Sequence, residues 1–178
     1  MLARGAKNAN LDPVRHAARA AALAEDRAVF HGYPQAGIGG IVEASAQSKC
    51  TLSEDYAAYA GVVAEATHKL RSAGIGGPYA IALGPRCFTG LSKTLVGGFP
   101  VMEHVRRLLD GPIIPAPAVD GAVVLSLRRG DFELTVGQDF SIGYLEHSAS
   151  TVRLYLQESF TFRVLSPEAA LPLAYTDG

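Results

Sequence analysis

Residues 151–164, TVRLYLQESFTFRV, carry the pattern that decides the fold of this chain. Polar and apolar side chains alternate here, and Glu158 is the break on the apolar face. A period of two predicts a β-strand, and about a dozen residues is longer than the usual five or six. We therefore expect a strand that extends past one compact core and suits contact between subunits. Its apolar positions are Leu154, Leu156, Phe160, Phe162 and Val164.

Two further strand-like runs precede this segment. Residues 122–127 and 132–136 flank Arg128-Arg129-Gly130-Asp131, which predicts a four-residue hairpin connection with Gly130 at positive φ. The last three of these residues also form an integrin-binding string. The turn is the favoured interpretation.

The N-terminal part predicts one long helix. Asp12 is a good N-cap, Pro13 suits the first turn, and residues 14–30 are dense in alanine. His31-Gly32-Tyr33-Pro34 ends the pattern. We expect a helix over about residues 12–33 whose small side chains allow close packing against a sheet.

The middle of the chain, residues 53–109, alternates between helical and strand-like runs. A loop with an exposed aromatic ring is expected at residues 95–100. Together with short strands at Ile113-Ile114 and residues 122–125, this section reads as a compact α/β lobe. The expected elements are a helix over 53–72, a strand over 79–83, and helices over 85–95 and 102–109.

The pentapeptide Ala-Gly-Ile-Gly-Gly occurs at residues 36–40 and again at 73–77. A glycine-rich loop cradles phosphate when it follows a strand and opens a helix. Both copies instead follow helical stretches, and the second leads into Pro78 and a strand. This order favours a helix C-cap followed by a turn.

Composition narrows the class of protein. The chain has 178 residues, a net charge of −1, 48% hydrophobic and 19% charged residues, and a mean hydropathy of +0.16. This charge argues against broad binding to nucleic acid or acidic membranes. No apolar run approaches the ~18 residues of a membrane-spanning helix. We expect a subunit that buries apolar surface against other chains.

The sequence contains no recognisable catalytic, metal-binding or cofactor motif. His-Glu-x-x-His and Cys-x-x-Cys are absent, and Ser92 lacks the second glycine of a nucleophile elbow. We therefore predict no catalytic, cofactor-binding or metal-ligating residue; a Cys–His pair assembled by folding is left open. Without a signal-peptide pattern, Cys50 and Cys87 are expected to be free thiols in a cytoplasmic protein. The histidines are His16, His31, His68, His104 and His147.

Four stretches of the chain resemble the encapsulin family of bacterial shell proteins, also called the linocin-type bacteriocin family. The most specific is the run from Gly130-Asp131-Phe132 through Gly137-Gln138-Asp139-Phe140-Ser141-Ile142-Gly143-Tyr144 to Thr151–Phe162. The other three are residues 25–38, 73–79 and 98–105. The resemblance covers nearly the whole chain.

This resemblance implies an α+β protein with the Hong Kong 97-type capsid fold in truncated form, with a spine helix, an α/β A-domain and long C-terminal strands. Residues 1–34 and 129–178 would form an incomplete P-domain, and residues 35–128 the A-domain. It implies a non-enzymatic subunit that assembles with copies of itself into a cytoplasmic shell. The enclosed cargo would be a ferritin-like protein or a dye-decolourising peroxidase with a C-terminal targeting peptide, and neither nucleic acid nor membrane is an expected partner.

The resemblance also implies two functional surfaces. The segment Gly97-Gly98-Phe99 matches the family's pore loop, where small residues and one ring set an aperture. Asp139, Ile142 and Tyr144 fall in the segment that faces the lumen near the cargo-peptide groove. Polar and apolar alternation there suits docking of an extended peptide.

The chain departs from the family pattern at its beginning. Residues 3–7 resemble a position well inside a family member, so we expect the family's first helix, arm and long loop to be absent. Those parts complete the cargo groove and lock subunits together. A shell subunit is the first hypothesis; a remnant that folds as a monomer or small oligomer is the second, and a hydrolase or bacteriocin-like protein is the third.

Overall fold

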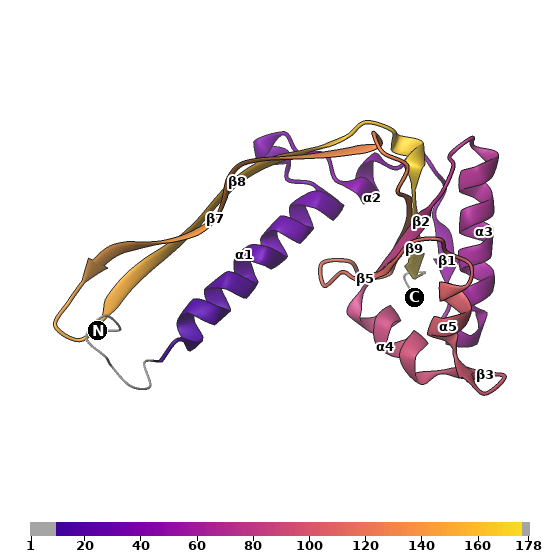
Figure 1. Ribbon diagram of the computed structural model, residues 1–178, viewed down its shortest axis with the longest axis horizontal. Helices are drawn as coiled ribbons and strands as arrows, with labels where there is room; N and C mark the ends of the chain where they lie inside the picture. The colour runs from indigo at the N-terminus through magenta and orange to yellow at the C-terminus, as the bar shows by residue number, and fades with distance from the viewer. Residues whose placement is uncertain (1–9, 176–178) are drawn as a thin grey trace. The chain divides into compact units, whose positions relative to one another are not determined.

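The computed structural model describes residues 10–175, and the predicted match at residues 3–7 lies outside this range. The chain divides into two compact units, one comprising residues 1–25 and 135–161, the other residues 26–134 and 162–178. Both contain helix and strand, as Figure 1 shows. Within residues 10–175, no helix is both long enough and apolar enough to cross a membrane.

The second unit is built on a five-stranded mixed sheet with the order β1-β9-β6-β2-β5. The edge strands β1 and β5 run parallel to their neighbours, and the three central strands pair antiparallel. Sequence-distant strands lie side by side, since β9 sits between β1 and β6. The strands are β1 (Cys50–Leu52), β2 (Tyr79–Leu83), β5 (Ile113–Pro115), β6 (Ala122–Ser126) and β9 (Ala170–Tyr175).

Three helices pack side chains into the core of this unit: α3 (Tyr59–Ser72), α4 (Pro85–Lys93) and α5 (Val101–Arg106). Strand β2 is buried throughout, which confirms the predicted buried strand. Tyr79, Ile81 and Leu83 join the core cluster with side chains of α3, α4 and α5. Ala80 and Ala82 point to the opposite face because side chains alternate along a strand.

Helix α1 (Asp12–His31) confirms the predicted long helix. The helix is followed by Gly32, where φ is +78° and a side chain would collide with the backbone of Gly40. The first pentapeptide then forms turns that lead to the short helix α2 (Ile41–Ala44). The second follows the end of α3, with Gly74 at a φ of +78°, so the predicted C-cap is confirmed there.

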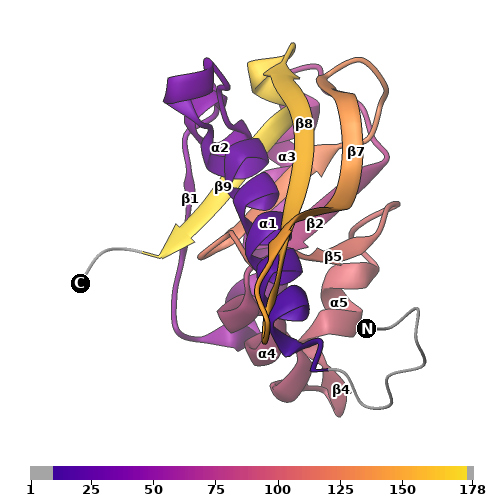
Figure 2. The same ribbon diagram turned by 90° about the vertical axis from the view of Figure 1, so that its left-hand side faces the viewer.

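The two longest strands, β7 (Phe132–His147) and β8 (Val152–Val164), pair with each other in a two-stranded sheet. They run side by side in both ribbon views (Figures 1 and 2). At their tip the Ser148 amide donates to the Thr151 carbonyl at 2.8 Å. The predicted overlong strand is therefore confirmed. None of the described residues in the first unit is buried.

The predicted hairpin around residues 128–131 is wrong. β6 pairs with β2 and β9, whereas β7 pairs with β8, so the two flanking strands belong to different sheets. Gly130 does have a positive φ of 96°. The Arg128 guanidinium donates to both carboxylate oxygens of Asp131, and the amides of Leu165 and Ser166 donate to its carbonyl. These bonds fix the local conformation of the turn, and Asp131 is buried, whereas an integrin-binding motif needs an exposed aspartate.

The compact units divide the chain at different residues from the expected P-domain and A-domain, whose boundaries stay a prediction. The expectation placed all of residues 129–178 in a P-domain. In the structure β9, which belongs to this range, lies within the five-stranded sheet, where Leu171 and Leu173 join the core cluster. The sequence analysis predicted no strand at residues 170–175. This strand pairs with β1 and β6, which are distant in sequence.

Candidate functional site

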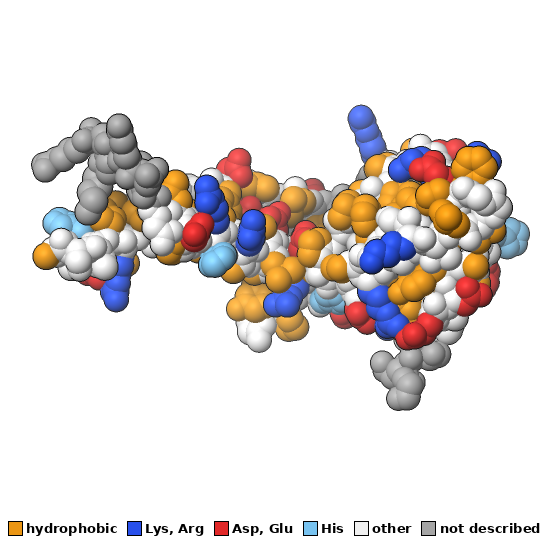
Figure 3. All heavy atoms as spheres, turned by 90° about the horizontal axis from the view of Figure 1, so that it is seen from below, with side chains coloured by type: hydrophobic (Ala, Val, Ile, Leu, Met, Phe, Trp, Pro, Cys, Tyr) orange, Lys and Arg blue, Asp and Glu red, His pale blue; other side chains and the backbone are white. Residues whose placement is uncertain are grey.

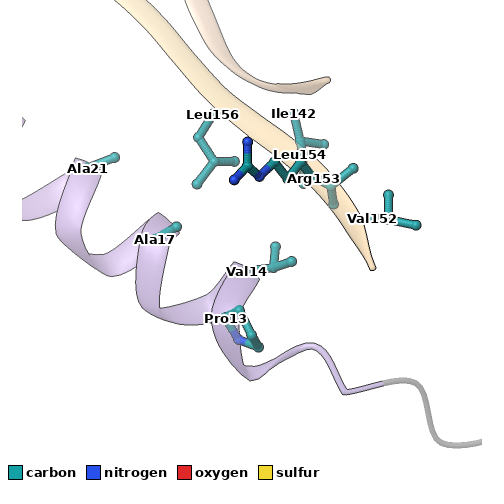
Figure 4. Close-up of a pocket in the computed structure, with 9 residues that line it drawn as sticks. All are labelled: Pro13, Val14, Ala17, Ala21, Ile142, Val152, Arg153, Leu154 and Leu156. Atoms are coloured by element: carbon teal, nitrogen blue, oxygen red, sulfur yellow. The ribbon is translucent and has the colours of Figure 1, made fainter. Parts of the chain in front are cut away.

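A shallow apolar groove of about 520 Å³ lies within the first unit, between α1 and the paired strands β7 and β8. Figure 4 shows the side chains of the helix facing those of the strands across the groove. Apart from the Arg153 guanidinium, the lining side chains are apolar. They are Pro13, Val14, Ala17, Ala21, Ile142, Val152, Arg153, Leu154 and Leu156.

The local sequence explains how this groove forms. Ala17 and Ala21 are four residues apart on one helix face, and their small side chains leave room beside the helix. Val152, Leu154 and Leu156 alternate along β8 and therefore share one face of the strand pair. The groove thus lies where the small-residue face of α1 faces the apolar face of β8.

Of the three predicted cargo-groove residues, the structure places Ile142 in the lining, with 53% of its surface exposed. Asp139 and Tyr144 lie on the same strand but outside this lining. The Asp139 carboxylate accepts from the Phe140 amide at 2.7 Å. The Tyr144 hydroxyl hydrogen-bonds to His147 Nδ1. A role in cargo binding stays a prediction for all three residues.

Sequence reasoning did not assign the helix side of this groove. The signal was present in the alanine-rich pattern of residues 14–30, which predicted a face suited to close packing. Which strand that face meets depends on contacts between distant segments, so Pro13, Val14, Ala17 and Ala21 could not be named in advance.

The predicted pore loop forms a tight hairpin in the second unit. Strands β3 (Leu95–Val96) and β4 (Phe99–Pro100) pair antiparallel, and Gly97 and Gly98 occupy the turn at φ of +59° and +83°. Two successive positive φ values favour a two-residue glycine turn. The residues are exposed, with Phe99 at 57%.

Two hydrogen bonds hold this hairpin at its base. The amide of Val101, the first residue of α5, donates to the Thr94 carbonyl at 2.9 Å. Nε2 of His104, also on α5, lies 3.0 Å from the Val96 carbonyl. The exposed tip is therefore tied to α5, and an aperture-lining role for Gly97, Gly98 and Phe99 stays a prediction.

Both cysteines are free thiols, as predicted, and the structure places both in buried positions. The Cys87 sulfur lies 3.5 Å from the Tyr59 hydroxyl and 3.3 Å from the Tyr175 hydroxyl. Burial raises the pKa of both phenols, and a hydrogen bond with Cys87 adds to the shift. Across residues 10–175, no three His, Cys, Asp or Glu side chains come together as metal ligands.

Comparison of the sequence with known proteins identifies its family and its relatives. Residues 1–161 match the family Linocin_M18, described as "Encapsulating protein for peroxidase". A type 1 encapsulin shell protein from Rhodospirillum rubrum is 58% identical over 173 residues, covering 97% of this chain and 62% of that protein. The chain thus spans less than two thirds of that relative, as it does of others that share the same name.

Two solved structures resemble the fold. A virus-like particle from Pyrococcus furiosus aligns at a TM-score of 0.64 and 18% identity, covering 84% of this chain and 62% of that one. Mycobacterium phage Che8 aligns at 0.65 and 14% identity, covering 96% and 65%. These likenesses confirm the Hong Kong 97-type α+β fold. The match over residues 1–161, which is more than half of the chain, shows that the chain belongs to the encapsulin family Linocin_M18.

Proposed function

We propose that this chain is a structural shell subunit of an encapsulin-type nanocompartment and assembles with copies of itself. The observation that carries the proposal is the first unit, whose described residues include none that is buried. A two-stranded sheet is at best marginally stable in water and needs a further partner surface. Exposed apolar side chains supply such a surface on β7 and β8: Val136, Phe140, Ile142, Leu145, Val152 and Leu154.

The partners proposed for these apolar strands are other copies of the same chain. Burying a leucine or isoleucine side chain contributes about 1.5–3 kcal/mol, and symmetric copies present the same strands repeatedly. The relatives are named as shell proteins, which supports a structural rather than catalytic role. Apolar side chains are visible on the surface of both units (Figure 3). In this proposal the shell is cytoplasmic.

The cargo would dock in the groove between α1 and β8. Its apolar lining and its volume of about 520 Å³ suit a short extended peptide with apolar side chains. A C-terminal targeting peptide of a peroxidase or a ferritin-like enzyme is the proposed occupant, and the family's description as encapsulating a peroxidase supports the first of these. Ile142 would contact the peptide directly.

The hairpin of residues 95–100 would line an opening in the shell. Phe99 is its exposed ring, and the two glycines add no side chains that would narrow the aperture. In assembled particles, Phe99→Ala should change the rate at which small molecules enter. The fold stability should change by no more than about 0.5 kcal/mol, as is typical of exposed sites.

Light scattering and electron microscopy of the purified full chain test the shell proposal. The expected result is closed particles containing many copies. A species no larger than a few subunits would overturn it and favour the small-oligomer hypothesis. Co-expression with a fluorescent protein carrying the peroxidase targeting peptide tests cargo binding. Ile142→Asp should abolish co-purification, whereas Ser92→Ala, on the exposed face of α4 in the other unit, should leave it unchanged.

A further inference from the structure

One charged side chain lines the apolar groove between α1 and β8. It belongs to Arg153, and the other eight lining residues are apolar (Figure 4). A guanidinium is planar, stays charged at neutral pH and carries several N–H donors. A ligand that lies in this groove therefore meets one fixed positive charge beside the apolar side chains.

Arg153 also lines a second cavity, of about 270 Å³, at the tip of the strand pair. Its other lining residues are all polar: Glu146, His147, Ser148 and Thr151. The apolar groove and this polar cavity thus share Arg153, and both lie within the first unit. A ligand with an apolar body and a polar end fits such a pair.

The polar cavity offers hydrogen-bond donors. The Ser148 hydroxyl accepts from the Ser150 and Thr151 amides, and it lies 2.7 Å from the Thr151 hydroxyl, to which it can donate. The Thr151 hydroxyl then has its own proton for a ligand. With the Tyr144 hydroxyl donating to Nδ1 of His147, the neutral imidazole carries its proton on Nε2. A hydroxyl, an imidazole N–H and a guanidinium are groups that donate to a carboxylate.

Glu146 is the acidic residue of this cavity. Its carboxylate pairs with Nη1 of Arg153 at 2.6 Å, and the two side chains are 57% and 71% exposed. An ion pair this exposed contributes little, because water screens the charges and two long side chains must be held in one geometry. The carboxylate of a ligand can therefore compete with Glu146 for the guanidinium.

We propose that Arg153 binds the C-terminal carboxylate of the cargo peptide, whose last apolar side chains lie in the groove while its terminus enters the polar cavity. This inference rests on the proposed function of the groove and gives its occupant a direction. A C-terminal peptide has this carboxylate whatever its sequence. Two parallel N–H groups of a guanidinium can donate to the two carboxylate oxygens, and polar sites at the end of a groove capture chain termini in this way.

Fluorescence anisotropy with the purified full chain tests this contact. The probe is a fluorescein-labelled peptide, Gly-Leu-Ser-Leu-Ser-Leu, whose leucines share one face when it is extended. It is made with a free C-terminal carboxylate and with a C-terminal amide, which removes the charge. The free acid should bind at least about tenfold more tightly, in line with hydrogen bonds to a charged group.

The two peptides separate this inference from the function on which it rests. Equal affinities would overturn the role of the carboxylate and leave the groove as a peptide site. No binding of either peptide would overturn the groove as a peptide site, and this inference with it.

Two variants on β8 separate the charge of Arg153 from a general effect on the strand. Arg153→Met keeps a long side chain without the guanidinium, so the free acid should bind only as tightly as the amide. Arg163→Met is the matched control, because Arg163 pairs with Glu133 at 3.5 Å and lines neither cavity. It should leave both affinities unchanged. A preference for the free acid that survives in Arg153→Met, or that is lost equally in Arg163→Met, would contradict the role of Arg153.

The competing carboxylate provides a test of opposite sign. Glu146→Gln removes the negative charge from the polar cavity, so the free acid should bind more tightly, by up to about fivefold for an exposed ion pair. Binding of the amide should not change. Weaker binding of the free acid to Glu146→Gln would show that the peptide carboxylate does not enter this cavity.

Discussion

The two units of this chain differ in how many of their side chains are buried. The second encloses a core between a five-stranded sheet and three helices, with side chains such as Leu70, Ile81 and Leu171 fully buried. The first contains the larger part of α1 and of the strand pair β7–β8, and its described residues all remain at least partly exposed. The same chain therefore joins a unit with its own buried core to one in which no described residue is buried.

The difference shows what alternation along a strand means. In β2, large and small side chains alternate and both faces are covered within the unit. In β8, the alternation is just as regular, yet Leu154 remains 44% exposed. Period-two patterning thus identifies a face that is to be buried and leaves open which molecule buries it.

The largest expected effect comes from the core of the second unit. Leu171→Ala removes a fully buried side chain from β9, so the free energy of unfolding should fall by about 2–5 kcal/mol. Chemical denaturation of the unassembled chain measures this loss. A change below 1 kcal/mol, on the order of an exposed site, would show that the second unit does not depend on this core.

The buried phenols give the second unit a pH dependence. Burial, with hydrogen bonds to Cys87 and Tyr175, raises the pKa of Tyr59 above its ordinary value of 10.0. The unfolded chain releases this proton first, so stability from this group is complete below pH 10 and is lost as pH rises further. The slope is at most about 1.4 kcal/mol per pH unit.

Unfolding measured between pH 8 and 11 in wild type and Tyr59→Phe isolates this contribution. The wild-type stability should fall more steeply at the alkaline end than that of the variant. Parallel curves would mean that Tyr59 does not hold its proton more strongly in the folded protein.

A smaller effect is expected at the exposed hairpin. Gly98 has a φ of +83° and open space around its Cα, so Gly98→Ala should cost about 1–2 kcal/mol through backbone strain alone. Gly61→Ala, inside α3 and also without close neighbours, should instead stabilise by about 0.5–1 kcal/mol. Thermal unfolding of the two variants should shift in opposite directions. Shifts of the same sign would contradict this account of the turn.

The smallest effect on folding is expected in the first unit. Leu154→Ala should change the unfolding free energy of the unassembled chain by no more than about 0.5 kcal/mol, because the side chain has little to lose there. The same change should reduce the fraction of protein in particles, measured by light scattering. A loss of several kcal/mol in the unassembled chain would place Leu154 in an internal core.

Local patterns in the sequence predicted much of the fold. Asp12, Pro13 and the alanine-rich run located α1, and the Tyr79–Leu83 run located β2, because caps and short periodicities act between near neighbours. These local patterns could not predict which strands pair with each other. The glycine turn at residues 128–131 was read as a hairpin, but β6 joins β2 and β9 through hydrogen bonds to sequence-distant segments.

The same distinction between local signals and contacts of distant segments applies to the candidate sites. The hairpin turn could be located because Gly97-Gly98 is a local signal for a tight turn. The groove could be predicted only on its strand side, at Ile142, since its helix side depends on how α1 meets β8.

Hydrogen–deuterium exchange on the assembled and unassembled chain tests the central contrast most directly. We predict that amides of residues 135–161 exchange rapidly in the unassembled chain and become protected on assembly. Amides of β2, β6 and β9 should be protected in both states. Equal, strong protection of residues 135–161 in the unassembled chain would contradict the account, because the first unit would then be stable without other subunits.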